Sequence, residues 1–362
     1  MGNHHRSFEL TKKQNQLRES FKQLIAGPCS AETREQVLAT AKEVSEIDEL
    51  TYFRAGIWKP RTAPGSFEGI GAEGLDWLKE AKHEYGVKSI TEVATPEHVE
   101  ACLKAGLDAL WIGARTTVNP FYIQQIADSL KGVDIPVFIK NPISPDVGLW
   151  MGAIERFKLA GISDVSVIHR GFFSYSKGVF RNPPMWEIPI KVKTEFPDLQ
   201  IICDPSHITG DSKLIEEVSK FAMQLGMDGL MIETHPSPPK AWSDAKQQVT
   251  PIHLKEIVNA ILLNKSDSDI SHSEIERMRK DVDGIDTQTL QEIAKRMLMV
   301  KEIAKFKKEN SATVFQHERW KHVLEESKKK AKELGLNEEF VEDLMNLIHK
   351  ESLNIHHTIY NS

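Results

Sequence analysis

The sequence has few cysteines, no long apolar run and no excess of positive charge. Its 362 residues include three cysteines, which are too few for a disulfide framework, so we expect free thiols in a reducing compartment. No apolar run is long enough to span a membrane, and the first residues lack the apolar core of a signal peptide. These absences predict a cytoplasmic protein without a membrane partner.

The charge balance argues against a nucleic-acid partner. The formal net charge is −6 and no basic tract occurs, whereas proteins that bind nucleic acid carry a basic patch or stripe. One stretch nevertheless gathers cations: FRAGIWKPRTAPGSFEGIG, residues 53–71, contains Arg54, Lys59 and Arg61. Fixed charges this close together in an acidic chain call for a local ligand.

Eight short strand-like runs alternate with amphipathic stretches through the first two thirds of the chain. The runs are residues 24–30, 51–57, 88–93, 108–114, 135–140, 164–169, 199–204 and 228–233. Eight strand and helix units in succession are typical of a (β/α)₈ or TIM barrel. An open doubly wound sheet is the alternative, but it would not need eight evenly spaced units. We predict an α/β barrel domain over residues 1–263.

The composition changes after the barrel. Residues 264–274, NKSDSDISHSE, are polar and predict a linker. Apolar residues then recur at three- and four-residue spacing from 275 to 304, and helical patterns follow near 315–334 and 338–360. We therefore predict an all-α domain of three helices over residues 275–362.

The polar residues of the barrel cluster at the predicted strand ends. In such barrels the βα loops at these ends form one mouth. The cations expected there are Arg54, Lys59, Arg61, Arg115, Lys140 and Arg170. Because like charges repel, they predict a polyanionic ligand, most simply two phosphates and a carboxylate.

A second set of residues suggests a metal ion. Cys29, His207, Glu233 and Asp244 follow strands one, seven and eight. A thiolate, an imidazole and two carboxylates make a plausible divalent site. Taken singly, a cysteine such as Cys29 is more often a small buried apolar residue, and a histidine such as His207 is more often structural.

These motifs resemble those of a known family. GPCS at 27–30, KPRT at 59–62, IGAR at 112–115, HRG at 169–171 and DPSH at 204–207 occur in the order found in 3-deoxy-D-arabino-heptulosonate 7-phosphate synthases of the compact barrel type. The resemblance covers about residues 20–262. It implies condensation of phosphoenolpyruvate with erythrose 4-phosphate, the entry step of the shikimate pathway and of aromatic amino acid biosynthesis.

The resemblance also implies residue roles. Cys29, His207, Glu233 and Asp244 would bind a divalent ion, for which manganese, iron, cobalt and zinc all remain open. Arg54, Lys59, Arg115, Lys140 and Arg170 would hold phosphoenolpyruvate, and Arg61 and Thr62 the aldose phosphate. Lys140 would exchange a proton and Glu92 would orient the attacking water.

Two other barrel chemistries compete with this interpretation. A 3-deoxy-D-manno-octulosonate 8-phosphate synthase would use arabinose 5-phosphate, but KPRT at 59–62 favours the heptulosonate enzyme. A barrel aldolase would form a Schiff base on Lys140 and would not need the metal set.

The helical region resembles the all-helical chorismate mutases over about residues 272–360. Arg296 and Lys307 are eleven residues apart, which is about three turns, so both project from one face. The resemblance implies substrate binding by Arg279, Arg296, Lys307, Gln316, Arg319, Ser352 and His356, with Arg279 donated across a homodimer. Trp320, Gln316 and His356 replace the Glu, the Asp and the Gln or Glu of many members.

We therefore expect a bifunctional enzyme. Lys307 and His356 would stabilise charge on the ether oxygen while chorismate rearranges to prephenate. Residues 1–23 are too short for a separate regulatory domain, so we expect allosteric feedback by prephenate through the helical domain. The alternative is a catalytically weak helical domain that serves dimerisation and sensing.

Overall fold

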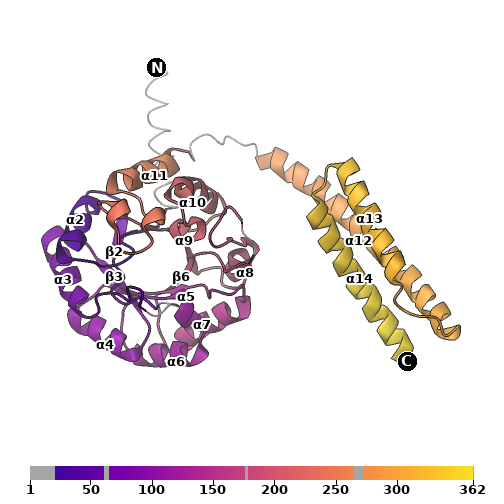
Figure 1. The fold of residues 1–362 in the computed structure, drawn as a ribbon, viewed down its shortest axis with the longest axis horizontal. Coiled ribbons are helices and arrows are strands. Elements are labelled where there is room, and N and C mark those ends of the chain that lie inside the picture. Colours follow the sequence, from indigo (N-terminus) through magenta and orange to yellow (C-terminus); the bar gives the residue numbers. More distant parts are fainter. Residues whose placement is uncertain (1–20, 61–64, 176–177, 265–271, 362) are drawn as a thin grey trace, which may run out of the picture. The chain divides into compact units, whose positions relative to one another are not determined.

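The computed structural model describes residues 21–60, 65–175, 178–264 and 272–361. Contacts divide the chain into two units, residues 1–267 and 268–362. The first unit is a closed barrel of eight parallel strands in chain order, which confirms the predicted barrel. Its helices encircle the strands (Figure 1). The strands are β1 (Gln23–Gly27), β2 (Leu50–Arg54), β3 (Ser89–Val93), β4 (Ala109–Ile112), β5 (Val137–Lys140), β6 (Val165–His169), β7 (Gln200–Cys203) and β8 (Gly229–Glu233).

A helix follows each strand, and some of these helices begin and end with typical capping signals. Thr95 caps the helix of residues 96–105 by accepting from the His98 amide, and Gly106 ends it with a positive φ of 74°. The helices of this unit are α2 (Arg34–Val44), α3 (Glu73–Tyr85), α4 (Pro96–Ala105), α5 (Ala114–Thr117), α6 (Pro120–Ser129), α7 (Val147–Leu159), α8 (Glu187–Glu195), α9 (Pro205–Thr209), α10 (Ile215–Gln224) and α11 (Pro251–Asn264), with short 3₁₀ turns at Ser212–Leu214, Pro238–Lys240 and Ala245–Gln247.

Two apolar layers hold the barrel together because the strands are buried on both faces. The interior contains a small cluster that includes Trp111, Phe138 and Ile168, whereas Leu110, Ile112 and Val167 point outward to the helices.

The first two predicted strands were too long, since β1 ends at Gly27 and β2 at Arg54. A Cβ on Gly27 would lie 2.1 Å from the carbonyl oxygen of Arg54. Cys29 therefore lies in the loop beyond β1.

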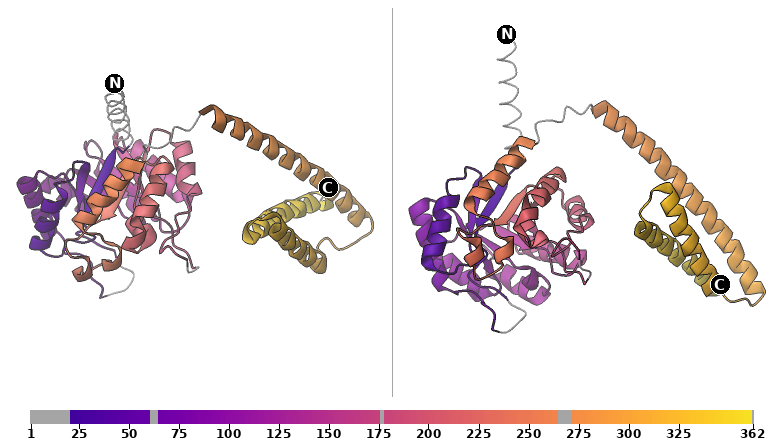
Figure 2. Two further views of the ribbon diagram at one scale, coloured as in Figure 1. Left: turned by 90° about the horizontal axis from the view of Figure 1, so that it is seen from above. Right: turned by 45° about the horizontal axis from the view of Figure 1, so that its top comes forward.

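The second unit consists of three helices, as predicted. They are α12 (His272–Glu309), α13 (His317–Leu334) and α14 (Glu338–Asn361). Its 38 residues make α12 about 57 Å long, and α14 packs against both α12 and α13 (Figure 2). Most of the predicted linker, residues 265–271, lies outside the described residues, between the end of α11 and the start of α12.

Candidate active sites

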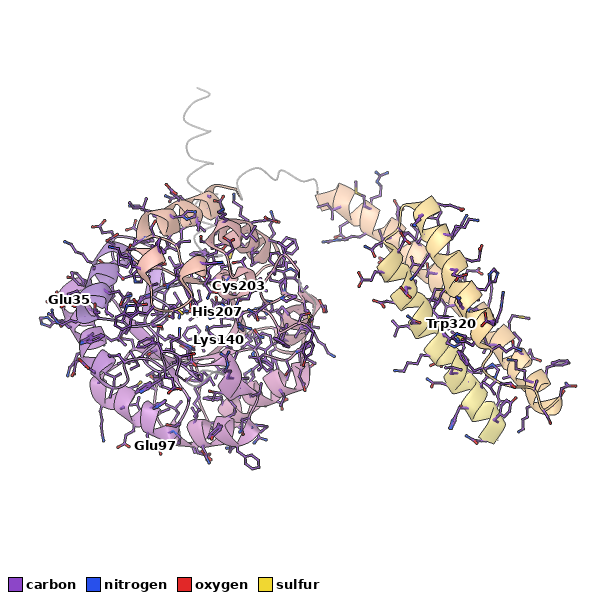
Figure 3. All side chains as sticks on the ribbon, viewed as in Figure 1. Glu35, Glu97, Lys140, Cys203, His207 and Trp320 are labelled. Atoms are coloured by element: carbon purple, nitrogen blue, oxygen red, sulfur yellow. The ribbon has the colours of Figure 1, made fainter. Side chains whose placement is uncertain are left out.

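One cavity of about 500 Å³ opens at the carboxyl ends of the barrel strands. Every described barrel residue predicted for the site lines it: Cys29, Arg54, Lys59, Glu92, Arg115, Lys140, Arg170, His207, Glu233 and Asp244. Figure 3 shows Lys140 and His207 near the middle of the ring, whereas Glu35 and Glu97 lie at its rim. Arg61 and Thr62 lie outside the described residues.

The fold gathers these side chains because several of them end strands. Arg54, Lys140 and Glu233 are the last residues of β2, β5 and β8. His207 lies in α9, whose N-terminus is capped by Asp204: the His207 amide donates to Asp204 Oδ1 over 3.1 Å. The sequence DPSH thus forms a short capped helix that directs the histidine into the cavity.

Lys140 forms a buried ion pair that sequence reasoning did not include. Its Nζ lies 2.9 Å from Asp204 Oδ2, and only 5% of the lysine side chain and none of the aspartate side chain is exposed. Burial acts to raise the pKa of the Asp204 carboxyl, but His207 and Lys140 hold that pKa well below its usual value. The aspartate therefore stays ionised beside Lys140 at neutral pH.

Arg54 is buried with unused hydrogen-bond donors. It is 2% exposed, and among the described residues its Nε and one terminal nitrogen have no hydrogen-bond partner. The other terminal nitrogen lies 3.3 Å from the carbonyl oxygen of Cys29 and 3.2 Å from Glu233 Oε1. The guanidinium also stacks over Trp111, 4.9 Å from the ring centroid. Buried donors without partners are costly, so they indicate an anionic ligand.

Arg170 is held in place by two asparagines, Asn141 and Asn182. Its amide donates to Asn141 Oδ1 over 2.7 Å, and its side chain donates to Asn182 Oδ1 over 3.0 Å. Burial lowers the pKa of the Arg170 guanidinium to about 10. The group therefore stays cationic at neutral pH and is fixed in orientation.

The four proposed metal ligands meet in two pairs. Cys29 Sγ lies 3.2 Å from Asp244 Oδ2, and His207 Nε2 lies 3.7 Å from Glu233 Oε1. Lys59 Nζ lies 2.5 Å from the sulfur of Cys29. Within the described parts of the chain, no three His, Cys, Asp or Glu side chains are arranged to hold a metal ion.

The donor chemistry of this set nevertheless fits a divalent ion. Burial lowers the pKa of His207 below its ordinary value, which leaves a neutral imidazole. Burial and the nearby Glu233 raise the pKa of the Cys29 thiol to about 12. The cysteine would therefore lose its proton when a metal binds. Without a metal, Arg54 pairs with Glu233 and Lys59 with Asp244.

Arg181 is a cavity residue that the sequence analysis missed. It donates to Asp244 Oδ1 over 2.9 Å and to Gln247 Oε1 over 2.8 Å. Trp111, Phe173 and Asn182 also line the cavity. Arg181 lies in the long loop between β6 and α8. A basic residue in a loop at the carboxyl end of a strand is the sequence feature that could have identified it.

In the helical unit, part of the predicted set comes together. Arg296 donates to Ser352 Oγ over 2.8 Å, and Lys307 donates to the carbonyl oxygen of Val314 over 2.8 Å. His356 is 8% exposed, and its Nδ1 has no hydrogen-bond partner among the described residues. Burial, followed by the Lys307 charge, lowers the pKa of His356 below its ordinary value.

Other predicted residues of this unit face outward in the single chain. Arg279, Gln316 and Arg319 are exposed, and Arg279 pairs with Glu276 over 2.6 Å. Trp320 instead stacks on His349, with ring centroids 3.9 Å apart. His349 was not predicted, although it shares a face of α14 with Ser352 and His356 through spacings of three and four.

Both units match known families. Residues 15–271 match the model of the DAHP synthetase I family, and residues 278–357 match that of type II chorismate mutase. A phospho-2-dehydro-3-deoxyheptonate aldolase of Thermotoga maritima is 33% identical over 235 residues, which is 65% of this chain and 67% of that protein. A 2-dehydro-3-deoxyphosphooctonate aldolase of Wolinella succinogenes is 28% identical over 262 residues, 66% of this chain and 97% of that protein.

Solved structures agree with the sequence matches. The crystal structure of the DAHP synthase from Thermotoga maritima aligns with a TM-score of 0.59 at 30% identity, covering 66% of this chain and 67% of that chain. A truncated 3-deoxy-D-arabino-heptulosonate 7-phosphate synthase from the same organism aligns with a TM-score of 0.57 at 28% identity, covering 66% and 84%. The chain therefore belongs to the DAHP synthetase I family, and its barrel is followed by a type II chorismate mutase domain.

Proposed function

We propose that the barrel condenses phosphoenolpyruvate with erythrose 4-phosphate and releases phosphate. The observation that carries this proposal is Arg54, a nearly buried arginine with unpartnered donors in the family's cavity. Arg115, Lys140 and Arg170 line the same cavity, so a substrate with a phosphate and a carboxylate would satisfy them. The test is release of phosphate from this substrate pair.

The two substrates would divide the cations between them. Arg54, Lys59, Arg115, Lys140 and Arg170 would hold phosphoenolpyruvate, and Arg61 and Thr62 of KPRT the aldose phosphate. Asn141 and Asn182 hold Arg170 in place. Its guanidinium would therefore need to move little as charge develops on the substrate.

Proton movement would involve Lys140 and Glu92. Carbon 3 of phosphoenolpyruvate attacks the aldehyde while water adds at carbon 2. Lys140 would exchange a proton with that water or with the new alkoxide. Glu92 would orient the water, and its own position is fixed by the Trp111 indole, which donates to Glu92 Oε2 over 2.9 Å.

A divalent metal completes the proposal. Cys29, His207, Glu233 and Asp244 would hold it, and when bound it would act as a Lewis acid on the aldehyde oxygen. Manganese, iron, cobalt and zinc all accept such a mixed ligand set. The variant Cys29→Ala should fold yet lose metal and condensation, and full activity of that variant in a strong chelator would contradict the assignment.

Two observations separate this reaction from its barrel alternatives. A Schiff base requires an amine that is free to attack a carbonyl carbon, whereas Lys140 Nζ is held in a buried ion pair with Asp204. Relatives named 2-dehydro-3-deoxyphosphooctonate aldolase are 28% or 29% identical, and the relative named phospho-2-dehydro-3-deoxyheptonate aldolase is 33% identical. Erythrose 4-phosphate is therefore favoured over arabinose 5-phosphate.

For the helical domain we propose rearrangement of chorismate to prephenate. Arg296 and Ser352 would bind the substrate, Lys307 and His356 would stabilise charge on the ether oxygen, and Arg279, Gln316 and Arg319 would complete the site. The Trp320 stack on His349 supports the alternative, a weak mutase that serves as a dimerisation and sensing module. The rate of chorismate loss distinguishes the two.

We also propose a homodimer formed by the helical domain. Large apolar side chains stay exposed along α12, among them Val282 at 54%, Ile285 at 61% and Phe306 at 66%. A soluble monomer rarely leaves so many uncovered, and a partner helix would bury them. No helix in the described residues could span a membrane. Because the barrel matches a family of biosynthetic enzymes, we propose a cytoplasmic location.

Prephenate feedback is the regulatory part of the proposal. A product that prefers one state of the helical domain can shift the barrel's activity by no more than its differential affinity, typically about 1 to 3 kcal/mol. The test compares phosphate release with and without prephenate in the full chain and in a chain ending near residue 263. Inhibition that is absent in the full chain, or unchanged in the shorter one, would rule the mechanism out.

A further inference from the structure

Glu32 is a buried acid that the proposed chemistry does not use. It lies three residues after Cys29 and is 4% exposed. A carboxyl group is rarely buried unless its oxygens have specific partners. The partners of Glu32 lie in the segment between Glu233 and Asp244, the two carboxylates of the proposed metal site.

Both carboxyl oxygens of Glu32 contact that segment. The Trp242 amide donates to Oε1 over 2.7 Å, and His235 Nε2 lies 3.5 Å from Oε2. His235 follows Glu233 by two residues, and Trp242 precedes Asp244 by two. Glu32, which lies in the loop of Cys29, therefore contacts this segment near both Glu233 and Asp244.

The orientation of the His235 ring is set by a backbone amide two residues further along the chain. Its Nδ1 accepts from the Ser237 amide over 2.9 Å, which leaves Nε2 facing Glu32. His235 is itself 4% exposed. The Ser237 amide therefore fixes the ring, whose Nε2 lies beside the Glu32 carboxyl group and has no hydrogen-bond partner among the described residues.

Asp244 needs such support because its backbone is strained. Its φ of 48° and ψ of 37° lie in the left-handed region, which a non-glycine residue keeps only where its surroundings enforce it. Ser30 Oγ contacts Ser243 Oγ over 2.5 Å, and Gln248 bridges the Cys29 amide and the Ser243 carbonyl oxygen. These contacts all join the loop of Cys29 to the loop of Asp244.

We propose that Glu32 is a positioning residue that sets the separation of Cys29 and Asp244 and thereby tunes metal affinity. This inference rests on the proposed metal site. Groups that orient metal ligands typically change affinity by about 10- to 100-fold when they are removed. Glu32 would do so through the backbone of Trp242 and without touching the metal.

The experiment titrates Mn²⁺ into the full chain by calorimetry and follows thermal unfolding of the same metal-free samples. Glu32→Ala should bind about 10- to 100-fold more weakly with a fully folded baseline. Glu32→Gln should fall between Glu32→Ala and the parent, because its amide keeps an acceptor for Trp242 but turns NH₂ protons toward His235. Glu35→Ala is the matched control, since Glu35 is an exposed acid in the first turn of α2, and it should bind as the parent does.

Each outcome has one meaning. If the parent binds Mn²⁺ and Glu32→Ala binds equally well, or binds less only in proportion to its unfolded fraction, the positioning role is wrong. If the parent itself binds no Mn²⁺, or Cys29→Ala binds as well as the parent, the proposed metal site fails instead. If Glu32→Ala does not fold, Glu32→Gln decides: weaker binding supports the role, and unchanged binding overturns it.

Discussion

Lys140 and Asp204 form a buried ion pair over 2.9 Å at the carboxyl ends of the barrel strands, and at most 5% of either side chain is exposed. They lie 64 residues apart in the chain and meet because Lys140 is the last residue of β5 and Asp204 directly follows β7, at the same end of the barrel. The pair keeps a cation fixed beside His207 and the cavity. It also restrains the amine that a Schiff-base mechanism would need to be free.

The first prediction concerns that ion pair. Lys140→Met should lower condensation by at least about 100-fold, because it removes the proposed proton-exchanging group. It should also destabilise the barrel, by up to about 3 to 5 kcal/mol, because the buried Asp204 loses its lysine partner and keeps only its contacts with His207. Steady-state phosphate release and thermal unfolding measure the two effects.

A double variant separates catalysis from stability. Lys140→Met with Asp204→Asn should recover most of the lost stability, since asparagine still caps α9, but it should not recover activity. Activity restored by the second change would show that Lys140 has no chemical role. Borohydride reduction with substrate should leave no adduct on Lys140, and a trapped adduct would favour the Schiff-base aldolase.

Much of the fold was predictable because its pattern is local. The barrel strands are short, mostly buried runs, and several helices, such as α2, α4 and α7, have side-chain caps, so neighbouring residues carry the signal. The strand ends of β1 and β2 were missed because the close approach of Gly27 to Arg54 is a tertiary contact.

The candidate sites were predictable only in part. The motif positions gather in one cavity, but motifs do not reveal contacts between distant residues. Arg181 and Asp244 are 63 residues apart, and no spacing rule joins them. The stack of Trp320 on His349 likewise joins two helices, so the sequence could show each residue but not the pair.

A second prediction separates the substrate subsites. Arg170→Ala or Arg115→Ala should raise mainly the KM for phosphoenolpyruvate, and Arg61→Ala mainly that for the aldose phosphate. Loss of one charged hydrogen bond costs about 1.5 to 3 kcal/mol, or roughly 10- to 150-fold. Equal changes in both Michaelis constants for all three variants would contradict the division.

A third prediction tests the mutase site. Arg296→Ala should weaken chorismate turnover by roughly 10- to 150-fold through the loss of a charged contact. Lys295→Ala is the matched control, because Lys295 is the adjacent residue and pairs with the exposed Glu292 over 2.7 Å. Chorismate loss is followed by absorbance. Equal effects of both changes would place the site elsewhere.

A fourth prediction concerns pH. His356 has a pKa below its ordinary 6.5, owing to burial and then Lys307. If its imidazolium donates to the ether oxygen, mutase kcat/KM should be highest in acid and fall as the pH rises through that lowered pKa. His356→Gln should remove this dependence. A parent profile that is flat across that range would show that the neutral ring suffices.

The most direct test of the barrel's activity is phosphate release by the full chain, loaded with Mn²⁺ or stripped by a chelator. Phosphoenolpyruvate is supplied with either erythrose 4-phosphate or arabinose 5-phosphate. We predict metal-dependent release with erythrose 4-phosphate and release slower by about 100-fold or more with arabinose 5-phosphate. Equal or faster release with arabinose 5-phosphate, or undiminished release after the metal is removed, would contradict the account.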